Sequence, residues 1–320
     1  MKCVRCTLIS NPASGTGREH RPDQISDVAS ALSAEGHSVT IELTTAPGSA
    51  SSQARRAVSG GAEVVFACGG DGTVHEVLQG LVNESGSPGA ALGIIPTGSA
   101  NALARHLRLS LDPVNAALAQ ARGIECTIPV GKIECDGQTR YFAVMAGAGP
   151  DGALVYRMNT ARKKQLGRSA YYLRAAQLFA TKRFPHFGVE YRVAGDDAAE
   201  ETHAVALMSV RVRNLGGLFG GLTSSAASIE ASELELYLIR RPAWLSLPLW
   251  FVSSWAGLQG RNPLLKHVRA SSFQCIPLNR SAIDVEADGE WIGRAPFGVS
   301  IVPKALRILM PQASCARSID

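Results

Sequence analysis

A glycine-rich loop directly after a continuous apolar segment is the feature that most constrains this chain. Residues 64–68 read Val-Val-Phe-Ala-Cys, which predicts a strand covered on both faces, as in a parallel sheet. The next five residues, Gly69 to Thr73, read Gly-Gly-Asp-Gly-Thr, and a helix is expected from Val74 to Leu81. Glycines permit a tight turn, and a helix N-terminus favours phosphate. The segment therefore predicts a phosphate site, with an ordinary glycine turn as the alternative.

The same alternation of strand and helix extends over the first 122 residues. The expected strands are 7–9, 39–43, 64–68 and 92–95, and the expected helices are 25–32, 49–59, 74–81, 100–107 and one that starts at Pro113 and stops at Gly123. Such a repeat predicts a doubly wound α/β domain whose ligand binds at the carboxyl ends of the strands.

Two further polar loops follow strands of this predicted sheet. They are Asn11-Pro12-Ala13-Ser14-Gly15 and Pro96-Thr97-Gly98-Ser99-Ala100-Asn101. Loops at the carboxyl ends of parallel strands meet at one edge of a sheet, so the three loops together predict a nucleotide pocket. Thr73 can add a hydroxyl there. Asp71 is an acid at a phosphate site, which favours a magnesium ion shared between the two.

The pattern changes after about residue 125. Short strand-like segments separated by turn residues predict a second, mostly antiparallel domain, and its expected strands are 127–128, 141–146, 188–193, 204–212 and 234–239. Residues 147–152 match GxGxxG, but no acid follows for the ribose of a dinucleotide, so we interpret them as a glycine-rich corner with Asp151 as a polar lining. Neither GxxxxGK[ST] nor GxSxG occurs, so a P-loop and a serine hydrolase lack support.

A second pair of acids lies at Asp288-Gly289-Glu290, in a turn between 283–285 and 291–292. A turn presents both carboxylates to one region, where they can act on a substrate. From the residues alone, a plain surface hairpin turn is the better interpretation.

Charge and hydropathy concern the surface. Residues 152–189 contain eight basic and no acidic side chains. The charge of this window is larger than the net charge of the whole chain, which is +5, so the rest of the chain is net negative. This window predicts either contact with anionic lipid headgroups or solvated helix faces. The stretch from Trp244 to Leu258 has an aromatic face with basic flanks, which predicts either core packing or a lipid-facing surface. The mild net charge does not indicate a nucleic-acid partner.

Three further features of the sequence predict where in the cell the protein is found. No apolar run reaches the length of about 20 residues that spans a bilayer. The N-terminus lacks the apolar core of a signal peptide. The seven cysteines are odd in number and scattered, which favours reduced thiols. We expect a cytoplasmic protein, with peripheral contact at the inner membrane face.

Taken in order, these motifs resemble the diacylglycerol kinase catalytic-domain family, which includes bacterial lipid kinases and the sphingosine and ceramide kinases. The resemblance is carried by Asn11-Pro12-x-Ser14-Gly15, Gly69-Gly70-Asp71-Gly72-Thr73 with Glu76, Gly93-x-x-Pro96-x-Gly98-Ser99-x-Asn101, Gly147-x-Gly149-x-Asp151, Leu166-Gly167-x-x-Ala170-Tyr171, Gly220-Gly221 and Asp288-Gly289-Glu290. It spans nearly the whole chain.

The resemblance implies transfer of the γ-phosphoryl group of ATP, with Mg²⁺, to the hydroxyl of a lipid such as diacylglycerol or a sphingoid base. It implies an α/β kinase domain (1–125) like that of NAD kinases, a sandwich-like β-rich domain (126–300), an active site in the cleft between them, and a terminal segment (301–320) that returns to the first domain.

The resemblance also assigns residues. Those expected to bind the nucleotide are Asn11, Ser14, Gly15, Thr44, Gly69, Gly70, Asp71, Gly72, Thr73, Glu76, Ser99 and Asn101. Glu290 is the implied general base, with Asp288 beside it, and Asp71 completes the catalytic set as the ligand of magnesium. A kinase of a soluble small molecule and a non-catalytic lipid-binding protein on a kinase scaffold remain the alternatives.

One departure from the family concerns a metal. Many bacterial members carry Asp-Asp-Gly-Leu-Leu-Asp in the second domain, where a structural magnesium ion can bind. Here residues 230–235 read Glu-Ala-Ser-Glu-Leu-Glu, and the missing acid at Ala231 argues against that ion.

Overall fold

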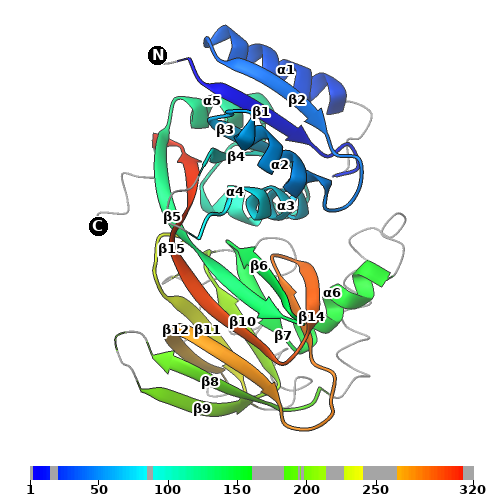
Figure 1. Cartoon of the computed structure of the whole chain (residues 1–320), viewed down its shortest axis with the longest axis vertical. Coiled ribbons are helices and arrows are strands. Elements are labelled where there is room, and N and C mark those ends of the chain that lie inside the picture. The colour runs from blue at the N-terminus through cyan, green and yellow to red at the C-terminus, as the bar shows by residue number, and fades with distance from the viewer. Residues whose placement is uncertain are drawn as a thin grey trace. The chain divides into compact units, whose positions relative to one another are not determined.

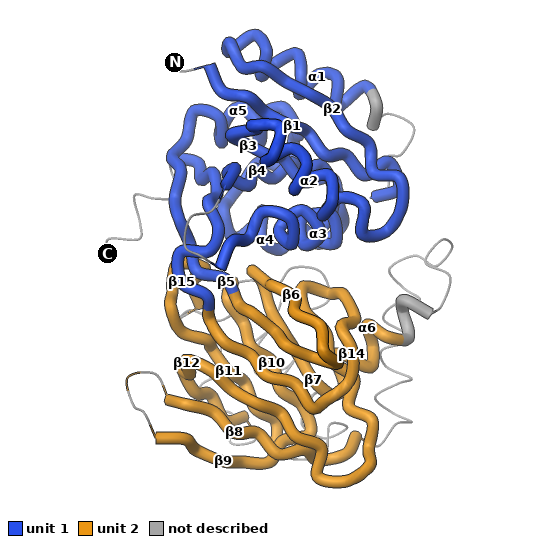
Figure 2. Tube along the Cα trace, viewed as in Figure 1, with its two compact units in different colours: residues 1–130, 302–320 blue, residues 131–301 orange. Residues whose placement is uncertain are grey.

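The computed structural model describes residues 3–14, 21–84, 89–160, 184–193, 195, 198–213, 227–240 and 265–312. The chain divides into two compact units, which Figure 2 colours separately. Unit 1 comprises residues 1–130 and 302–320, and unit 2 comprises residues 131–301. Two long strands run from one unit into the other, β5 (Ile124–Cys135) and β15 (Phe297–Met310).

Unit 1 is built on a parallel sheet. Its strands are β1 (Arg5–Ser10), β2 (Ser38–Leu43), β3 (Val64–Gly69) and β4 (Ala91–Pro96). They lie in the order β4-β3-β1-β2, and the C-terminal part of β15 pairs in parallel with β4 at Ile308 and Leu92. Every residue of β3 and β4 is buried, as the continuous apolar sequence of β3 predicts for a central strand.

Helices connect these strands (Figure 1). They are α1 (Arg21–Ala34), α2 (Ser49–Ser59), α3 (Asp71–Leu81), α4 (Ala102–His106) and α5 (Pro113–Ala121). Helix α1 packs on α5, and α2 packs on α3. One core cluster joins α1 and α5 to alternate residues of the strands, among them Leu8, Phe66 and Ile95. Burial of these apolar side chains stabilises the sheet at about 25 cal/mol per Å².

A buried glutamine joins α5 to the sheet. Gln120 is fully buried, its Oε1 accepts the N–H of Ile94 at 2.8 Å, and its Nε2 donates to the Ile94 carbonyl at 2.7 Å. Strand β15 is paired with β4 only at Leu92, so the side chain takes the place of a strand partner farther along β4. Buried backbone groups need such partners, which explains a polar residue on the inner face of α5.

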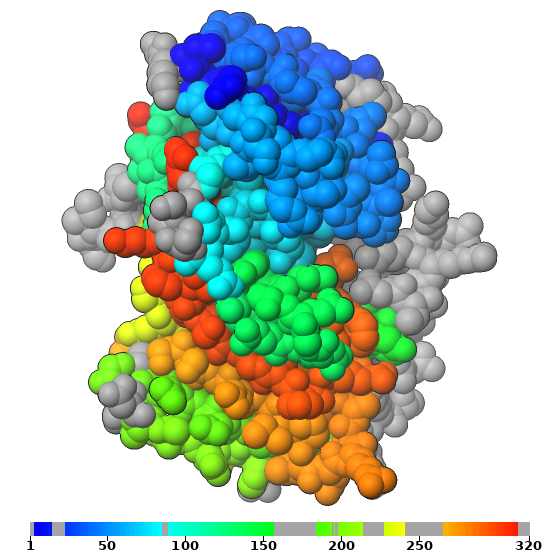
Figure 3. Space-filling model, in the orientation of Figure 1, coloured from blue at the N-terminus to red at the C-terminus, as the bar shows by residue number. Residues whose placement is uncertain are grey.

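Unit 2 is mainly antiparallel. Its strands, besides parts of β5 and β15, are β6 (Gln138–Phe142), β7 (Met145–Ala148), β8 (Phe187–Val193), β9 (Ala199–Ala204), β10 (Ala206–Val210), β11 (Leu234–Ile239), β12 (Leu265–Pro277), β13 (Asp284–Ala287) and β14 (Glu290–Arg294). Its main sheet has the order β14-β13-β7-β10-β11-β12, and β12 also pairs with the N-terminal part of β15. Strand β8 pairs with β12 and with β9. Strands β5 and β6 form a hairpin. On the face that Figure 3 shows, this hairpin, coloured green, lies at the surface of unit 2.

The glycine-rich corner predicted at residues 147–152 connects a strand to a helix. It consists of the end of β7, a turn and the start of α6 (Pro150–Thr160). Gly149 adopts a positive φ of 95°, and a Cβ there would lie 2.5 Å from the Val205 carbonyl oxygen. The turn therefore requires glycine for both its conformation and its packing.

Two predicted strands are each divided in the structure. The segment 141–146 is broken between β6 and β7, because the N–H groups of Ala143, Val144 and Met145 bond to the Asp288 carboxylate instead of a strand. The segment 204–212 is divided at Val205, whose N–H donates to the Ile239 carbonyl at 2.8 Å. Apolar sequence alone does not reveal a change of hydrogen-bonding partner.

The predicted class, a doubly wound α/β domain followed by a β-rich sandwich-like domain, is confirmed. In the part of the chain that the structure describes, no helix is both long and apolar enough to cross a membrane. Most of the basic window and the stretch 244–258 lie outside the described residues, so both interpretations of each stay predictions.

Candidate functional site

Three loops of unit 1 meet at the carboxyl ends of adjacent strands. The Thr97 N–H donates to the Gly69 carbonyl at 2.9 Å, which joins the loops after β4 and β3. The Ser14 and Thr97 hydroxyl oxygens are 3.3 Å apart, within hydrogen-bond distance. Asn11 Nδ2 donates to Thr73 Oγ1 at 3.2 Å. The convergence predicted from the order of strands is therefore present in unit 1.

Glycines bring two of these loops into backbone contact. A Cβ on Gly98 would lie 2.4 Å from the Gly70 Cα, and a Cβ on Gly70 would lie 3.2 Å from the Gly98 Cα. A Cβ on Gly69 would lie 2.3 Å from Thr73 Oγ1. None of the three has a positive φ, so they are needed for close approach and not for an unusual backbone conformation.

Asp71, the first residue of α3, fixes the third loop. Its Oδ2 accepts the Asn101 N–H at 2.9 Å and its Oδ1 accepts the Ala102 N–H at 2.7 Å, where α4 begins. Asn101 adopts a left-handed φ of 50°, and its side chain bonds to both the N–H and the carbonyl of Gly98. Asp71 therefore holds the loop that carries Ser99, whose side chain is exposed.

The remaining predicted nucleotide residues surround this cluster in different ways. Thr44 follows β2, and its N–H donates to the Ser10 carbonyl at 2.9 Å. Glu76 Oε2 accepts the Ala50 N–H at 3.2 Å, in the first turn of α2, so it links α3 to α2. Gly72 lies in the first turn of α3, where N–H groups and the helix dipole favour an anion. Gly15 lies outside the described residues.

The Asp-Gly-Glu segment of unit 2 forms the turn between β13 and β14. Asp288 and Gly289 adopt φ values of 49° and 80°, the two positive angles of a tight hairpin turn. Both Asp288 oxygens accept backbone N–H groups at 2.9 to 3.0 Å, those of Ala143, Val144 and Met145, and only 8% of the residue is exposed. Glu290 begins β14 and is partly exposed. The turn is therefore rigid on the aspartate side and open at the glutamate.

A buried pair of carboxyl groups supports the same turn. Asp151 of α6 and Glu286 of β13 are 8% and 1% exposed. A Cβ on Gly147 would lie 2.6 Å from Asp151 Oδ2 and 3.0 Å from Glu286 Oε1, so both side chains converge on that glycine. Glu286 Oε2 accepts the Gly289 N–H at 2.8 Å, which ties the pair to the Asp-Gly-Glu turn.

Burial and mutual repulsion set the protonation of this pair. Burial, and then the Asp151 charge, raise the pKa of Glu286 well above its usual value, whereas burial raises the pKa of Asp151 to about 6. The hydrogen bond between the two groups lowers the pKa of Asp151 and raises that of Glu286. Glu286 is therefore the protonated member of the pair and donates this hydrogen bond to the Asp151 carboxylate.

Sequence reasoning missed two residues of unit 2. Glu286 lies two positions before Asp288, and its inward direction could have been predicted only from the alternation along β13. Arg211 is 1% exposed, and nothing in the local sequence marks an arginine as buried. Asp151, predicted as a polar lining of the glycine-rich corner, lies against Gly147 of that corner, where it forms the buried pair with Glu286.

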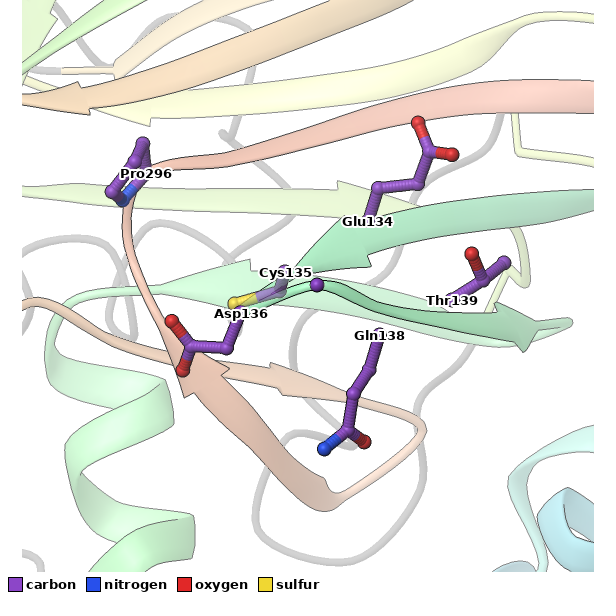
Figure 4. Close-up of a pocket in the computed structure, with 7 residues that line it drawn as sticks. Glu134, Cys135, Asp136, Gln138, Thr139 and Pro296 are labelled. Atoms are coloured by element: carbon purple, nitrogen blue, oxygen red, sulfur yellow. The ribbon is translucent and has the colours of Figure 1, made fainter.

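A cavity of about 410 Å³ opens beside the turn of the β5–β6 hairpin. It is lined by Glu134, Cys135, Asp136, Gly137, Gln138, Thr139 and Pro296 (Figure 4). None of the residues predicted to bind nucleotide or to act in catalysis lines it. The cavity therefore does not enter the assignment of the site.

Comparison with known proteins relates the chain to a single family. The diacylglycerol kinase catalytic domain matches residues 5–133, and the YegS C-terminal NAD kinase beta sandwich-like domain matches residues 144–310. A protein of Bacillus subtilis (strain 168) named diacylglycerol kinase is 26% identical, and the alignment covers 99% of each chain. One named diacylglycerol kinase from Staphylococcus saprophyticus is 24% identical, over 96% of this chain and 95% of that one.

A solved structure agrees with this assignment at the level of the fold. A diacylglycerol kinase from Bacillus anthracis str. Sterne superposes with a TM-score of 0.70, covering 98% of this chain and 99% of that one at 19% identity. Together with the two domain matches, which extend over most of the sequence, this agreement identifies the chain as a member of the diacylglycerol kinase catalytic-domain family.

Proposed function

We propose that this protein is an ATP-dependent lipid kinase that transfers the γ-phosphoryl group to a free hydroxyl of a long-chain acceptor. The observation that carries the proposal is the three-loop cluster of unit 1, locked around the glycine-rich N-terminus of α3. A family of kinases and a rigid Asp-Gly-Glu turn in unit 2 support it.

In this proposal the loops of unit 1 bind the nucleotide. The N–H groups of the first turn of α3 and the hydroxyls of Ser14, Thr73 and Ser99 are donors of the kind that phosphate oxygens accept. We assign Asp71 as the magnesium ligand, because Mg²⁺ prefers carboxylate oxygens and Asp71 is the first residue of α3, next to the proposed phosphate site. Magnesium, when bound with ATP, would supply neutralisation of phosphate charge.

The proposed base is Glu290. A carboxylate that accepts the proton of the acceptor hydroxyl makes its oxygen a better nucleophile, and such assistance accelerates a reaction by roughly 10² to 10⁴-fold. Asp288 is committed to three backbone N–H groups, so we assign it to positioning of the turn. Phosphoryl transfer depends mainly on positioning and on charge stabilisation, which is consistent with a rigid turn.

The acceptor is proposed from the relatives. Proteins aligned over nearly the whole chain are named diacylglycerol kinase, which favours diacylglycerol as the substrate. A sphingoid base presents the same chemistry, an apolar chain with one free hydroxyl. We propose that the enzyme is cytoplasmic and that its basic window, residues 152–189, meets anionic headgroups at the inner membrane face.

A lipid panel tests the proposal. The full chain is incubated with magnesium and γ-labelled ATP, together with vesicles that contain diacylglycerol, a sphingoid base or neither, and NAD in a separate reaction. We expect label in a lipid product only. Label on NAD would favour a kinase of soluble molecules. Tight vesicle binding without any labelled product would contradict the proposed activity and favour a lipid-binding protein.

A further inference from the structure

Arg211 is the largest fully buried side chain among the described residues, with 1% exposure. It follows β10 in unit 2, and its backbone N–H donates to the Val144 carbonyl at 2.8 Å. Burial lowers the pKa of Arg211 to about 10, so the guanidinium remains a cation at neutral pH. A buried charge is costly unless it is paired and hydrogen-bonded, so its partners indicate its role.

The guanidinium joins two segments of unit 2. Nη2 donates to the Ile229 carbonyl at 2.8 Å, and Nη1 reaches the Ala231 carbonyl at 3.4 Å. The charge that favours the cation is Asp288, which raises the pKa of Arg211 against the effect of burial. Val144 lies between the two groups, since its carbonyl accepts the Arg211 N–H and its N–H donates to Asp288 Oδ1 at 2.9 Å. The Arg211 cation therefore binds the turn before β11 and lies near the carboxylate that organises the Asp-Gly-Glu turn.

The acids of this region do not fit the structural magnesium ion that the family pattern implies. Ala231 supplies no carboxylate. Glu235 is hydrogen-bonded to His267, and Glu233 pairs with Arg269 at 3.4 Å. The Ile229 and Ala231 carbonyls, which are oxygens of the kind a hard cation prefers, accept from Arg211 instead. Among the described residues, no three acidic, histidine or cysteine side chains gather as metal ligands.

We propose that Arg211 is the resident cation of this region of unit 2, and that its guanidinium takes the role of a divalent ion in holding the 229–231 turn and Asp288. Arg211 is thus a positioning residue for the turn that presents Glu290. This catalytic consequence rests on the proposed kinase function, whereas the structural role does not.

Metal dependence tests the structural role without any activity. The full chain, free of nucleotide, is unfolded thermally in EDTA and in millimolar Mg²⁺ at matched ionic strength, and its magnesium content is measured after dialysis. We expect the same midpoint in both solutions and no stoichiometric magnesium. A magnesium-dependent rise in midpoint that Glu233→Gln abolishes would overturn the proposal, because it would show a divalent site in this region.

Charge substitutions test the catalytic consequence. Arg211→Lys keeps a cation, whereas Arg211→Gln keeps a donor for the carbonyls without charge, and exposed Arg192→Gln on β8 is the control. We expect kcat of Arg211→Gln to be roughly tenfold or more below that of Arg211→Lys, per folded molecule, with the Kd for ATP unchanged. Equal kcat values for the Lys and Gln variants would overturn the role of the charge.

The unfolding experiment and the kinetic experiment distinguish failure of the Arg211 proposal from failure of the proposed kinase function. If the wild-type chain labels no lipid, the proposed function fails, and the comparison of midpoints still decides on Arg211. If Arg211→Gln does not fold while Arg211→Lys does, the requirement for a cation is supported by stability alone. If both variants and the wild-type chain share one midpoint, the guanidinium has no such role and the proposal fails.

Discussion

Glu286 and Asp151 couple proton binding to the turn that carries Glu290. Glu286 accepts the Gly289 N–H with one oxygen and converges with Asp151 at Gly147 with the other. The pKa of each carboxyl is higher in the folded chain than its ordinary value, chiefly because both groups are buried. The folded state therefore holds protons that the unfolded chain has lost.

The sign of the resulting pH dependence follows from these shifts. Stability from the pair is fully present below the ordinary pKa values of 3.8 for Asp151 and 4.5 for Glu286. It is lost as the pH rises through the raised pKa values, which are about 6 for Asp151 and well above 4.5 for Glu286. For each proton that only the folded state binds, the free energy of unfolding falls by about 1.4 kcal/mol for every unit by which the pH rises.

Glu286→Gln tests this coupling. The amide can still donate to Asp151 and accept from Gly289, but it does not titrate. We expect the variant to gain free energy of unfolding relative to the wild-type chain as the pH rises from 5 to 8, by about 1.4 kcal/mol per pH unit or less, in urea titrations. The exposed Glu201→Gln is the control. Parallel curves for the Glu286 variant and the wild-type chain would contradict the shared proton.

At the scale of elements, two of the proposed nucleotide-binding loops are in close backbone contact. Gly70 lies in the loop after β3 and Gly98 in the loop after β4. A methyl group on Gly98 would lie 2.4 Å from the Gly70 Cα. The nearest atom belongs to the backbone, and the next, Asn101 Oδ1 at 2.7 Å, accepts the Gly98 N–H, so the loops themselves must separate. Overpacking of this kind costs about 1 to 3 kcal/mol.

Gly98→Ala is expected to weaken ATP binding. Separation of the loops moves Thr97 and Asn101, whose hydrogen bonds to Gly69 and Asp71 hold the cluster. We expect the Kd for ATP to rise roughly tenfold or more, since 1.4 kcal/mol corresponds to a factor of ten. Gly188→Ala in β8 is the matched control, because a Cβ there meets only ordinary contacts at 3.6 Å and beyond. Equal affinity in both variants would show that the contact is not required.

The elements of unit 1 could be predicted from the sequence because each carries its own signal. The buried strand β3 is continuously apolar. Helix α5 begins at Pro113 and is capped by Asp112, whose carboxylate accepts the Asn115 N–H. The breaks at Ala143 and Val205 could not be predicted, since each depends on a hydrogen-bond partner distant in sequence, Asp288 or Ile239.

The candidate site likewise contains residues that local sequence predicts and residues that it does not. Loops after adjacent parallel strands converge by topology, so the glycine-rich cluster followed from the pattern of strands and helices. Arg211 and Glu286 are charged residues whose burial depends on partners in other strands, and no local pattern marks them. Asp71 illustrates both cases, because its place in the loop was predicted but its bonds to Asn101 and Ala102 were not.

At the scale of the whole molecule, the proposed reaction uses groups from both units. The proposed nucleotide-binding loops belong to residues 1–130, and the Asp-Gly-Glu turn belongs to residues 131–301. The division predicts that a change in the turn alters catalysis without altering nucleotide affinity.

The most direct measurement is transfer of label from γ-labelled ATP to diacylglycerol in vesicles, for the wild-type chain and for Glu290→Gln. We expect the wild-type chain to label the lipid, and the variant to do so roughly 10² to 10⁴ times more slowly. The Kd for ATP of the variant should lie within a factor of about two of the wild-type value, because Glu290 is not among the proposed nucleotide-binding residues. A factor of two corresponds to only about 0.4 kcal/mol of binding free energy. Wild-type transfer by Glu290→Gln would contradict its role as the base, and no labelled lipid from the wild-type chain would contradict the lipid kinase itself.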